Sequence, residues 1–350
     1  MRQAPSRRRT LVACALIGIG ALAGTVAILL PTYAVPQLRK IPLDVSANTV
    51  SEAPESQLVD AAATASGHAR TETGVPLRFR VYVTIEEPSD AHLVTVQAAT
   101  SMTRTDKPAD QPFISASVDR VTLDRVTAMP VADPPSQVAV VTTRPPDLTP
   151  DRAGIQYKFP FDVQRRSYPF FDMTSRTTHP IDYVDDDRVI DGMRLRHFHQ
   201  RLAPINLRPG QPEAKLTLSA AAWGLPDVPA DQQVTFDLYF EIERDVWVEP
   251  LSGAMVAVQE HLHRFLARSV DDPHALTTLD ARTTFDQATL DHTAKLARDA
   301  RTQLLWAGRY GPILLGAAGA VLIVAGIVLG VSASRQRRRT EAGPQDTSAP

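Results

Sequence analysis

The chain has 350 residues, of which 43% are hydrophobic and 22% charged, and its formal net charge is −2. Its single cysteine, Cys14, excludes an internal disulfide. Residues 31–309 hold 29 basic and 37 acidic side chains, a net charge of −8, which argues against nucleic acid as a partner.

Both ends of the chain carry an uncharged apolar run beside a basic segment. Residues 1–10 are basic and precede the run at 11–30, while a second run at 311–332 precedes a basic tail at 333–350. Twenty helical residues at about 1.5 Å each cross a hydrocarbon core of about 30 Å, so each run predicts a transmembrane helix. The flanking basic residues are Arg7, Arg8, Arg9, Arg335, Arg337, Arg338 and Arg339. The positive-inside rule then predicts a two-pass protein of the cell membrane with both termini in the cytoplasm.

Two alternatives stay open for the first apolar run. A cleaved signal peptide has the same layout, although Tyr33-Ala34-Val35 is a poor small-residue cleavage site. Leu11-Val12-Ala13-Cys14 spells a lipoprotein-type box, but Cys14 stands at the start of the run, whereas lipoprotein processing needs the cysteine at its far end. We therefore favour an uncleaved helix.

Small residues recur at four-residue spacing in both runs. Gly20 and Gly24 lie in the first run, and Gly326 and Gly330 lie in the second. Glycines at this spacing let two helix backbones approach closely, although glycine is frequent in membrane helices in any case. The frequency of glycine in membrane helices is the favoured explanation of this spacing, and pairing of the two helices, within one chain or between chains of a homo-oligomer, is the alternative.

The region between the two runs is predicted to be a β-rich (α+β) extracytoplasmic domain with mainly antiparallel sheet. Residues 31–75 contain few large apolar side chains, and we expect a mostly irregular lead-in there. In residues 76–280, apolar and polar side chains alternate with a period of two, typical of half-buried strands. Strands are expected at 77–85, 92–98, 118–126, 137–142, 193–199, 215–221 and 234–242. Residues 281–310 are predicted to form a helical connector, with the helix at 283–306.

One segment, KFPFDVQRRSYPFFD at 158–172, concentrates five aromatic residues in a chain that is only 6% aromatic. Together with Tyr183, Asp191-Gly192 and the stretch VWVEPLSG at 246–253, it resembles the signature of the actinobacterial porin PorA family, a family of unknown function. The resemblance implies a membrane span at each end and an extracytoplasmic region between them. The family name implies a pore, but two uncharged helices cannot enclose an aqueous channel unless several chains assemble.

Two interpretations of the aromatic segment are possible. The favoured one is that the rings fill the core of a sheet, with Phe159 and Phe161 on one side of a strand and Asp162 and Asp172 fixing bends. The other is a groove for an apolar or glycan ligand, near the basic side chains Arg165, Arg166 and Arg176. The candidate ligand-binding residues are then Phe159, Phe161, Tyr168, Phe170, Phe171 and Trp247.

No arrangement in the sequence predicts catalysis, a cofactor or a metal. The pairs His197/His199 and His261/His263 each offer two imidazoles on one face of a strand, but zinc requires three or four ligands. The run at 185–187 (Asp-Asp-Asp) lacks the spacing of a calcium loop and is interpreted as a solvated turn. Glu249 has no partner carboxylate of the kind that a glycosidase needs and is interpreted as a turn residue.

The leading hypothesis is therefore a non-enzymatic envelope protein. Its outer domain is expected to bind, hand over or scaffold an envelope component such as a lipid or glycolipid. Membrane lipids, other envelope proteins and further copies of the chain are the expected partners. The alternatives are a pore-forming oligomer, and an envelope hydrolase or transferase whose site the sequence does not reveal.

Overall fold

The computed structural model describes residues 5–108, 113–140 and 145–341; the side chains of residues 5–7 and 336–341 lie outside that description. The chain divides into two compact units. A helical unit holds both ends of the chain, residues 1–40 and 301–350, and a β unit holds residues 41–300.

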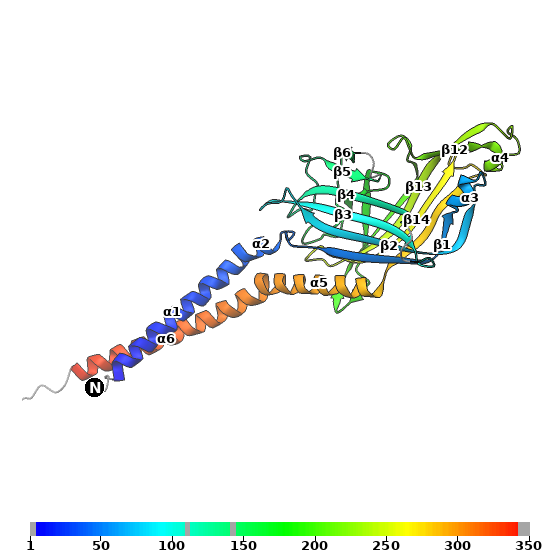
Figure 1. Ribbon diagram of the computed structural model, residues 1–350. Coiled ribbons are helices and arrows are strands. Elements are labelled where there is room, and N and C mark those ends of the chain that lie inside the picture. The colour runs from blue at the N-terminus through cyan, green and yellow to red at the C-terminus, as the bar shows by residue number, and fades with distance from the viewer. Residues whose placement is uncertain (1–4, 109–112, 141–144, 342–350) are drawn as a thin grey trace, which may run out of the picture. The chain divides into compact units, whose positions relative to one another are not determined.

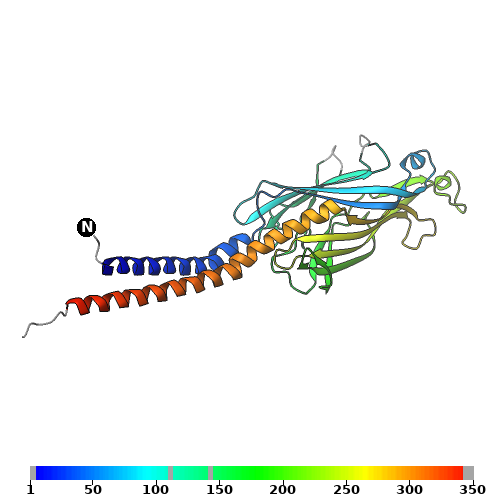
Figure 2. The same ribbon diagram turned by 90° about the horizontal axis from the view of Figure 1, so that it is seen from below.

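The helical unit consists of two long apolar helices that lie side by side (Figures 1 and 2). The first comprises α1 (Pro5–Leu29), a π-helical turn η1 (Leu30–Ala34) and α2 (Val35–Leu38). The second enters this unit as the end of α5 (Gln287–Leu305) and continues through a π-helical turn η2 (Trp306–Tyr310) into α6 (Gly311–Glu341). Both are long and apolar enough to cross a membrane. The chain thus has a membrane-spanning apolar helix near each end, as the sequence predicted.

The β unit is built on one antiparallel sheet of 13 strands. Its order is β6-β5-β4-β3-β2-β1-β15-β14-β13-β11-β8-β7, with β12 beside β13, and β9 and β10 form a separate hairpin. The strands are β1 (Ala47–Val59), β2 (Thr71–Glu86), β3 (Leu93–Arg104), β4 (Ser115–Asp124), β5 (Ser136–Ala139), β6 (Asp147–Thr149), β7 (Tyr168–Asp172), β8 (Thr177–Asp185), β9 (Val189–Ile190), β10 (Met193–Arg194), β11 (Arg196–Asn206), β12 (Lys215–Ser219), β13 (Gln233–Val248), β14 (Met255–Ala267) and β15 (Leu276–Phe285). Two short helices, α3 (Ala61–Ala65) and α4 (Ala220–Trp223), lie in the connections. The predicted β-rich, mainly antiparallel class is confirmed.

The sheet curls, so that strands from its two ends share a core. Arg176, between β7 and β8, pairs with Asp147 of β6 at 2.8 Å, and Arg152 pairs with Asp119 of β4 at 2.6 Å. Between these edges, Ile155 forms a bridge to Phe170 of β7. The main core accordingly combines side chains of β3 and β4 with those of β7, β8, β11 and β13. Strand β13 illustrates the alternation, because Phe236, Phe240, Ile242, Val246 and Val248 are all buried at even positions.

The structure corrects the expectation that residues 31–75 are mostly irregular. Strand β1 occupies Ala47–Val59, and β2 begins at Thr71. β1 pairs with β2 on one side and β15 on the other, so neighbouring backbones hold it in the sheet without a run of large apolar side chains. Ala53 is fully buried in this position.

Three other features, two element boundaries and one irregular stretch, differ from the sequence-based expectation. The helix after the sheet begins at Gln287 rather than Thr283, because Thr283–Phe285 still pair within β15 and Asp286 accepts a hydrogen bond from the Thr289 N–H at 2.7 Å. The strand expected to reach Ala221 ends at Ser219, whose hydroxyl caps α4. The stretch at 156–167 is irregular, so Phe159 and Phe161 do not share a face of a strand.

Candidate functional site

An open apolar crevice of about 840 Å³ lies within the helical unit beside the two π-helical turns. This volume falls in the range of about 300–1,000 Å³ that small-molecule sites occupy. The first helix contributes Leu30, Tyr33, Ala34, Gln37 and Leu38, and the second contributes Gln303, Trp306, Ala307, Gly311, Leu314 and Leu315.

Proline and glycine explain why both helices widen here. Pro31 lies in η1 and Pro312 follows η2; since proline has no N–H and its ring clashes with the preceding turn, an ordinary α-helical hydrogen-bond pattern cannot continue through it. A Cβ at Gly311 would lie 2.6 Å from the Trp306 carbonyl oxygen and 3.1 Å from Leu30 Cδ1. The second distance shows that the two widened turns face each other.

Two aromatic side chains, Tyr33 and Trp306, line this crevice, and Tyr310 contacts Trp306. Tyr33, Trp306 and Tyr310 are all exposed, and the rings of Trp306 and Tyr310 meet edge to face at 6.0 Å between centroids. Tyrosine and tryptophan have an apolar body and a polar tip, and they are enriched where a membrane meets water. The apolar wall with Gln37 and Gln303 on it suits a ligand that is mostly hydrocarbon.

The two helices are antiparallel and touch through small residues. A Cβ on Gly20 would lie 2.7 Å from the Gly319 carbonyl oxygen, and one on Gly326 would lie 2.8 Å from the Ala13 carbonyl oxygen. A Cβ on Gly24 would meet no atom within 4 Å, and one on Gly330 would make an ordinary 3.7 Å contact with Ala13. Gly319 was not among the glycines predicted to pair the helices, although its four-residue spacing from Leu315 and Ile323 places it on a helix face with them.

The flanking arginines lie on these helices. Arg8, Arg9 and Arg335 are exposed. The side chains of Arg7, Arg337, Arg338 and Arg339 lie outside the described residues.

The aromatic segment of the β unit is largely interior. Phe159, Tyr168 and Phe170 lie in the main core with Phe198, and the Phe159 ring is 5.5 Å from that of Tyr168 and 4.7 Å from that of Phe198. Phe171 is also buried, with the Arg152 guanidinium 4.2 Å from its ring. These four rings therefore fill space inside the curled sheet.

The two remaining aromatic candidates lie elsewhere. Phe161 is half-buried, and the Lys158 ammonium lies 3.6 Å above its ring. Trp247 belongs to a separate cluster that packs α5 on the sheet, and it stacks on His197 at 4.8 Å. The six candidates do not line one surface.

Two of the motif segments interlock. The Phe159 N–H donates to the Gly253 carbonyl at 3.0 Å, and the Val163 N–H donates to the Pro250 carbonyl at 2.8 Å. Buried Glu249 closes the turn by accepting hydrogen bonds from the Ser252 N–H and hydroxyl at 2.7 and 2.8 Å. The stretches at 158–163 and 249–253 are thus one structural element.

Lys158 is the first residue of the stretch at 158–163 that pairs with 249–253. Burial lowers its pKa to about 7, against the opposing effect of the Glu249 carboxylate. Its ammonium donates to the Phe159 carbonyl at 2.8 Å. The motif resemblance includes this segment, but nothing in the sequence indicates that Lys158 is half-buried.

A charged network that was not predicted from the sequence lies in the interior of the β unit. Buried Arg244 donates to Asp172 at 2.7 Å, to Gln200 at 3.0 Å and to Glu260 at 3.1 Å. The sequence contains one indication of this network. Arg244 lies at an alternate position of β13 between Ile242 and Val246, and these alternate positions face the core. A charge at such a position predicts an internal partner.

Both histidine pairs lie on the opposite face of the sheet from Arg244. His197 and His199 share the Asp245 carboxylate at 2.7 and 3.0 Å. His261 pairs with Asp280 at 2.9 Å, and His263 pairs with Glu241 at 2.7 Å. Each imidazole therefore has a carboxylate partner on a neighbouring strand.

The model of the family described as porin PorA matches residues 12–328. A protein named porin PorA from Corynebacterium amycolatum is 30% identical over 377 aligned positions, which cover 89% of this chain and 96% of that protein. A second porin PorA, from Corynebacterium resistens, is 27% identical over 415 positions, covering 95% of this chain and all of the relative. The chain belongs to the porin PorA family.

Proposed function

We propose that this chain is a two-pass protein of the cell membrane that holds lipid in the crevice between its helices. The basic residues at both chain ends support a cytoplasmic location for both termini, with the β unit outside. In this proposal the β unit is an extracytoplasmic platform for an envelope lipid, a glycolipid or a partner protein, and it performs no catalysis.

The crevice carries this proposal. Its walls belong to the membrane-spanning helices, so the hydrocarbon of the bilayer reaches it. The exposed rings of Tyr33, Trp306 and Tyr310 support a position at the membrane–water boundary. We therefore infer that the occupant is a lipid acyl chain, with the headgroup beside the aromatic rings.

The hydroxyl groups of the apolar helices support a lipid-facing role rather than a water-filled path. Thr25 and Thr32 donate to the carbonyls of Ala21 and Ile28 at 3.0 and 2.7 Å, within their own helix. Ser332 likewise donates to the Leu329 carbonyl at 2.8 Å. Hydroxyls satisfied in this way need no water.

The test of this proposal introduces a large side chain that fills the crevice. Ala34→Trp places a large ring in the apolar wall, whereas Leu29→Trp puts the same ring on an exposed position of the same helix that does not line the crevice. Native mass spectrometry of the full-length protein in mild detergent should show retained lipid in the wild type and in Leu29→Trp, with occupancy reduced at least tenfold in Ala34→Trp. Equal occupancy in the two variants would exclude the crevice as the site.

Phe161 is the remaining ligand-binding candidate of the aromatic segment, because its ring is half-buried while the other five candidates are buried. Loss of a defined glycolipid from a folded Phe161→Ala variant, with the crevice lipid retained, would assign a second contact to the β unit. If the variant and the wild type contain the same lipids, Phe161 contacts no bound lipid, and its role is limited to the contact between its ring and the Lys158 ammonium.

A pore-forming oligomer is the second candidate, and the name of the relatives, porin PorA, favours it. Large apolar side chains such as Leu22, Ile28 and Val321 are exposed on the helices and could contact further copies. Stepwise conductance in planar bilayers that increases with protein concentration and is unchanged by Ala34→Trp would favour the pore over lipid binding.

A further inference from the structure

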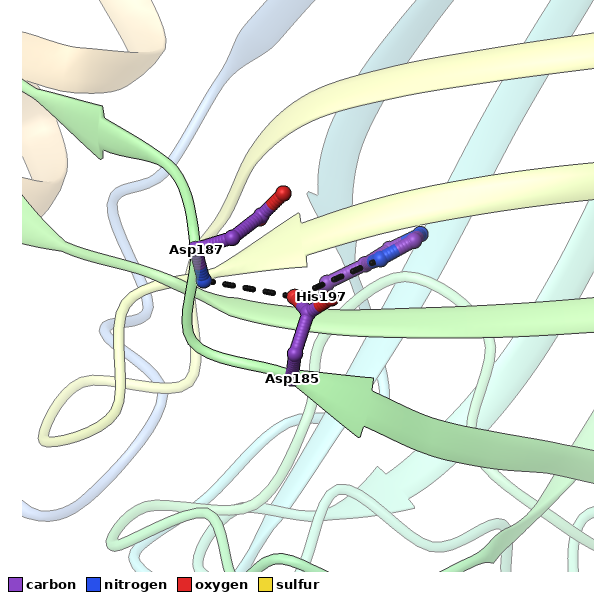
Figure 3. A group of neighbouring side chains, drawn as sticks. All are labelled: Asp185, Asp187 and His197. Atoms are coloured by element: carbon purple, nitrogen blue, oxygen red, sulfur yellow. Dashed lines mark hydrogen bonds and ion pairs between the residues drawn. The ribbon is translucent and has the colours of Figure 1, made fainter.

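We propose that Asp185, Asp187 and His197 form a binding site for a divalent transition-metal ion such as Zn²⁺ or Mn²⁺. Asp185 ends β8, Asp187 follows in the next turn, and His197 lies in β11. One potential ligand atom from each of these side chains lies within 4.8 Å of the other two (Figure 3).

Strand register brings the three residues together. β8 and β11 are antiparallel neighbours, and Asp185 is the direct partner of His197. The Asp187 N–H donates to the Asp185 carboxylate at 3.2 Å, so the chain turns back over β11 (Figure 3). From the sequence alone, residues 185–187 are interpreted as a solvated turn because they lack the spacing of a calcium loop, and nothing in the sequence places a histidine beside them.

The hydrogen bonding of His197 is that of a metal ligand. Its Nε2 lies 2.7 Å from Asp245 Oδ1, so an Nε2–H donates to that carboxylate and leaves the Nδ1 lone pair free. Nδ1 faces Asp185 Oδ1 at 3.6 Å, which is too long for a hydrogen bond. A carboxylate that fixes the far nitrogen of an imidazole is the usual second shell of a histidine–metal bond.

The imidazole is also held rigidly. Its ring stacks on Trp247 with an interplanar angle of 9°, and the Arg188 guanidinium lies 4.5 Å from the same tryptophan. The His197 side chain is only 15% exposed. A ligand with a fixed ring orientation loses little side-chain entropy when a metal binds.

The middle aspartate, Asp186, forms ion pairs with two arginines, Arg165 and Arg196. It also accepts a hydrogen bond from the Tyr183 hydroxyl at 3.3 Å. Among the described residues, neither Asp185 nor Asp187 forms an ion pair with an arginine or lysine. A bound cation would offset the charge of these two carboxylates.

The donor set indicates the class of metal. One imidazole nitrogen and two carboxylate oxygens suit Zn²⁺ or Mn²⁺, whereas Ca²⁺ and Mg²⁺ prefer oxygen ligands alone. Three protein ligands leave at least one position for water. The bound ion would fasten the turn after β8 to β11, so we assign it a structural role.

The test uses metal-stripped full-length protein in detergent, purified without a histidine tag. Isothermal titration with Zn²⁺ and with Mn²⁺ should show one saturable site at pH 7.5 for at least one of these ions. Asp185→Asn, Asp187→Asn and His197→Gln should each weaken binding at least tenfold. Binding of the same ion should raise the unfolding temperature of the wild type but not of Asp187→Asn.

Two matched variants separate this site from adventitious binding. Asp186→Asn changes the middle residue of the aspartate run, and His261→Gln removes a histidine with the same kind of carboxylate partner, Asp280. Both should bind the ion as the wild type does. No saturable site for either ion, wild-type binding by Asp187→Asn, or an equal loss in His261→Gln would overturn the proposal.

Discussion

Gly253 shows at the scale of one residue how the two motif segments depend on each other. Its φ is +72°, and a Cβ built there would lie 2.2 Å from the Phe159 carbonyl oxygen and 2.4 Å from that of Pro160. The backbone of the aromatic segment therefore occupies the space that a side chain would need. Only glycine permits this approach.

Gly253→Ala should destabilise the protein by about 2–5 kcal/mol, combining about 1–2 for the left-handed conformation with about 1–3 for the clash. Gly192→Ala is the matched control, because Gly192 has a φ of +73° but open space around it. That variant should lose only about 1–2 kcal/mol. Denaturant unfolding of the full-length protein, followed by tryptophan fluorescence, measures the difference; equal losses would mean that the clash is absent.

Lys158 makes stability depend on pH. Its pKa is lowered from 10.5 in the unfolded chain to about 7 in the fold. Between these values the unfolded state binds more protons, so stability increases with pH, by up to about 1.4 kcal/mol per pH unit. Lys158→Met removes this contribution.

The unfolding free energies of the wild type and of Lys158→Met should therefore converge or cross as the pH rises from 7 to 10, with the variant relatively more stable at pH 7. Arg78→Met, which removes an exposed ion pair with Glu52, serves as control and should show no such trend. A pH-independent difference between wild type and Lys158→Met would contradict the lowered pKa.

At the scale of elements, the helical unit depends on a pairing of the two apolar helices within one chain. The ideal Cβ of residue 316 lies 3.9 Å from Ala27 Cβ, close to the mean separation of about 3.8 Å in disulfides. Gly18, in contrast, would place a Cβ where no atom lies within 4 Å. This difference provides a direct test of the pairing.

In a Cys14→Ser background, Ala27→Cys/Gly316→Cys should form an intramolecular disulfide on mild oxidation, while Gly18→Cys/Gly316→Cys should not. Non-reducing gel electrophoresis after proteolysis between the helices distinguishes a bond within one chain from a bond between chains. A dimer band as the main product would mean that the helices pair between copies instead.

At the scale of the whole molecule, the chain joins a membrane-spanning helical unit to a β unit that holds several of its charged side chains in ion pairs and hydrogen bonds. Buried Arg244 and Arg152 each pair with a carboxylate inside the sheet. The outer face of β11, β13, β14 and β15 carries histidines paired with carboxylates. These features suit an independently folded domain that faces water, as the proposed topology requires.

That topology predicts which positions a membrane-impermeant maleimide can reach. In a Cys14→Ser background, Val140→Cys in the β unit should react in intact cells stripped of their wall, because Val140 is 52% exposed. Thr347→Cys in the tail should react only after the membrane is permeabilised. The reverse pattern would invert the orientation, and labelling of both would indicate that the second helix does not span.

The sequence by itself determined the class of the protein and its main elements. Within one helix or strand, the buried side chains recur at a fixed spacing. The two apolar runs and the alternation in β2 and β13 can therefore be recognised within about twenty residues. The motif residues also identified the family. Strand β1 escaped prediction because it has few large apolar side chains, and pairing with β2 and β15 contributes much of what holds it in the sheet.

Only the tertiary structure decided which distant residues meet. Gly20 contacts Gly319, Arg244 reaches Asp172, and His197 lies beside Asp185. Each of these contacts depends on how two separate elements are aligned, and a register shift by one residue would turn the strand side chains to the other face. A single sequence does not display that register, so it can name the aspartates and the histidine but cannot place them around one ion.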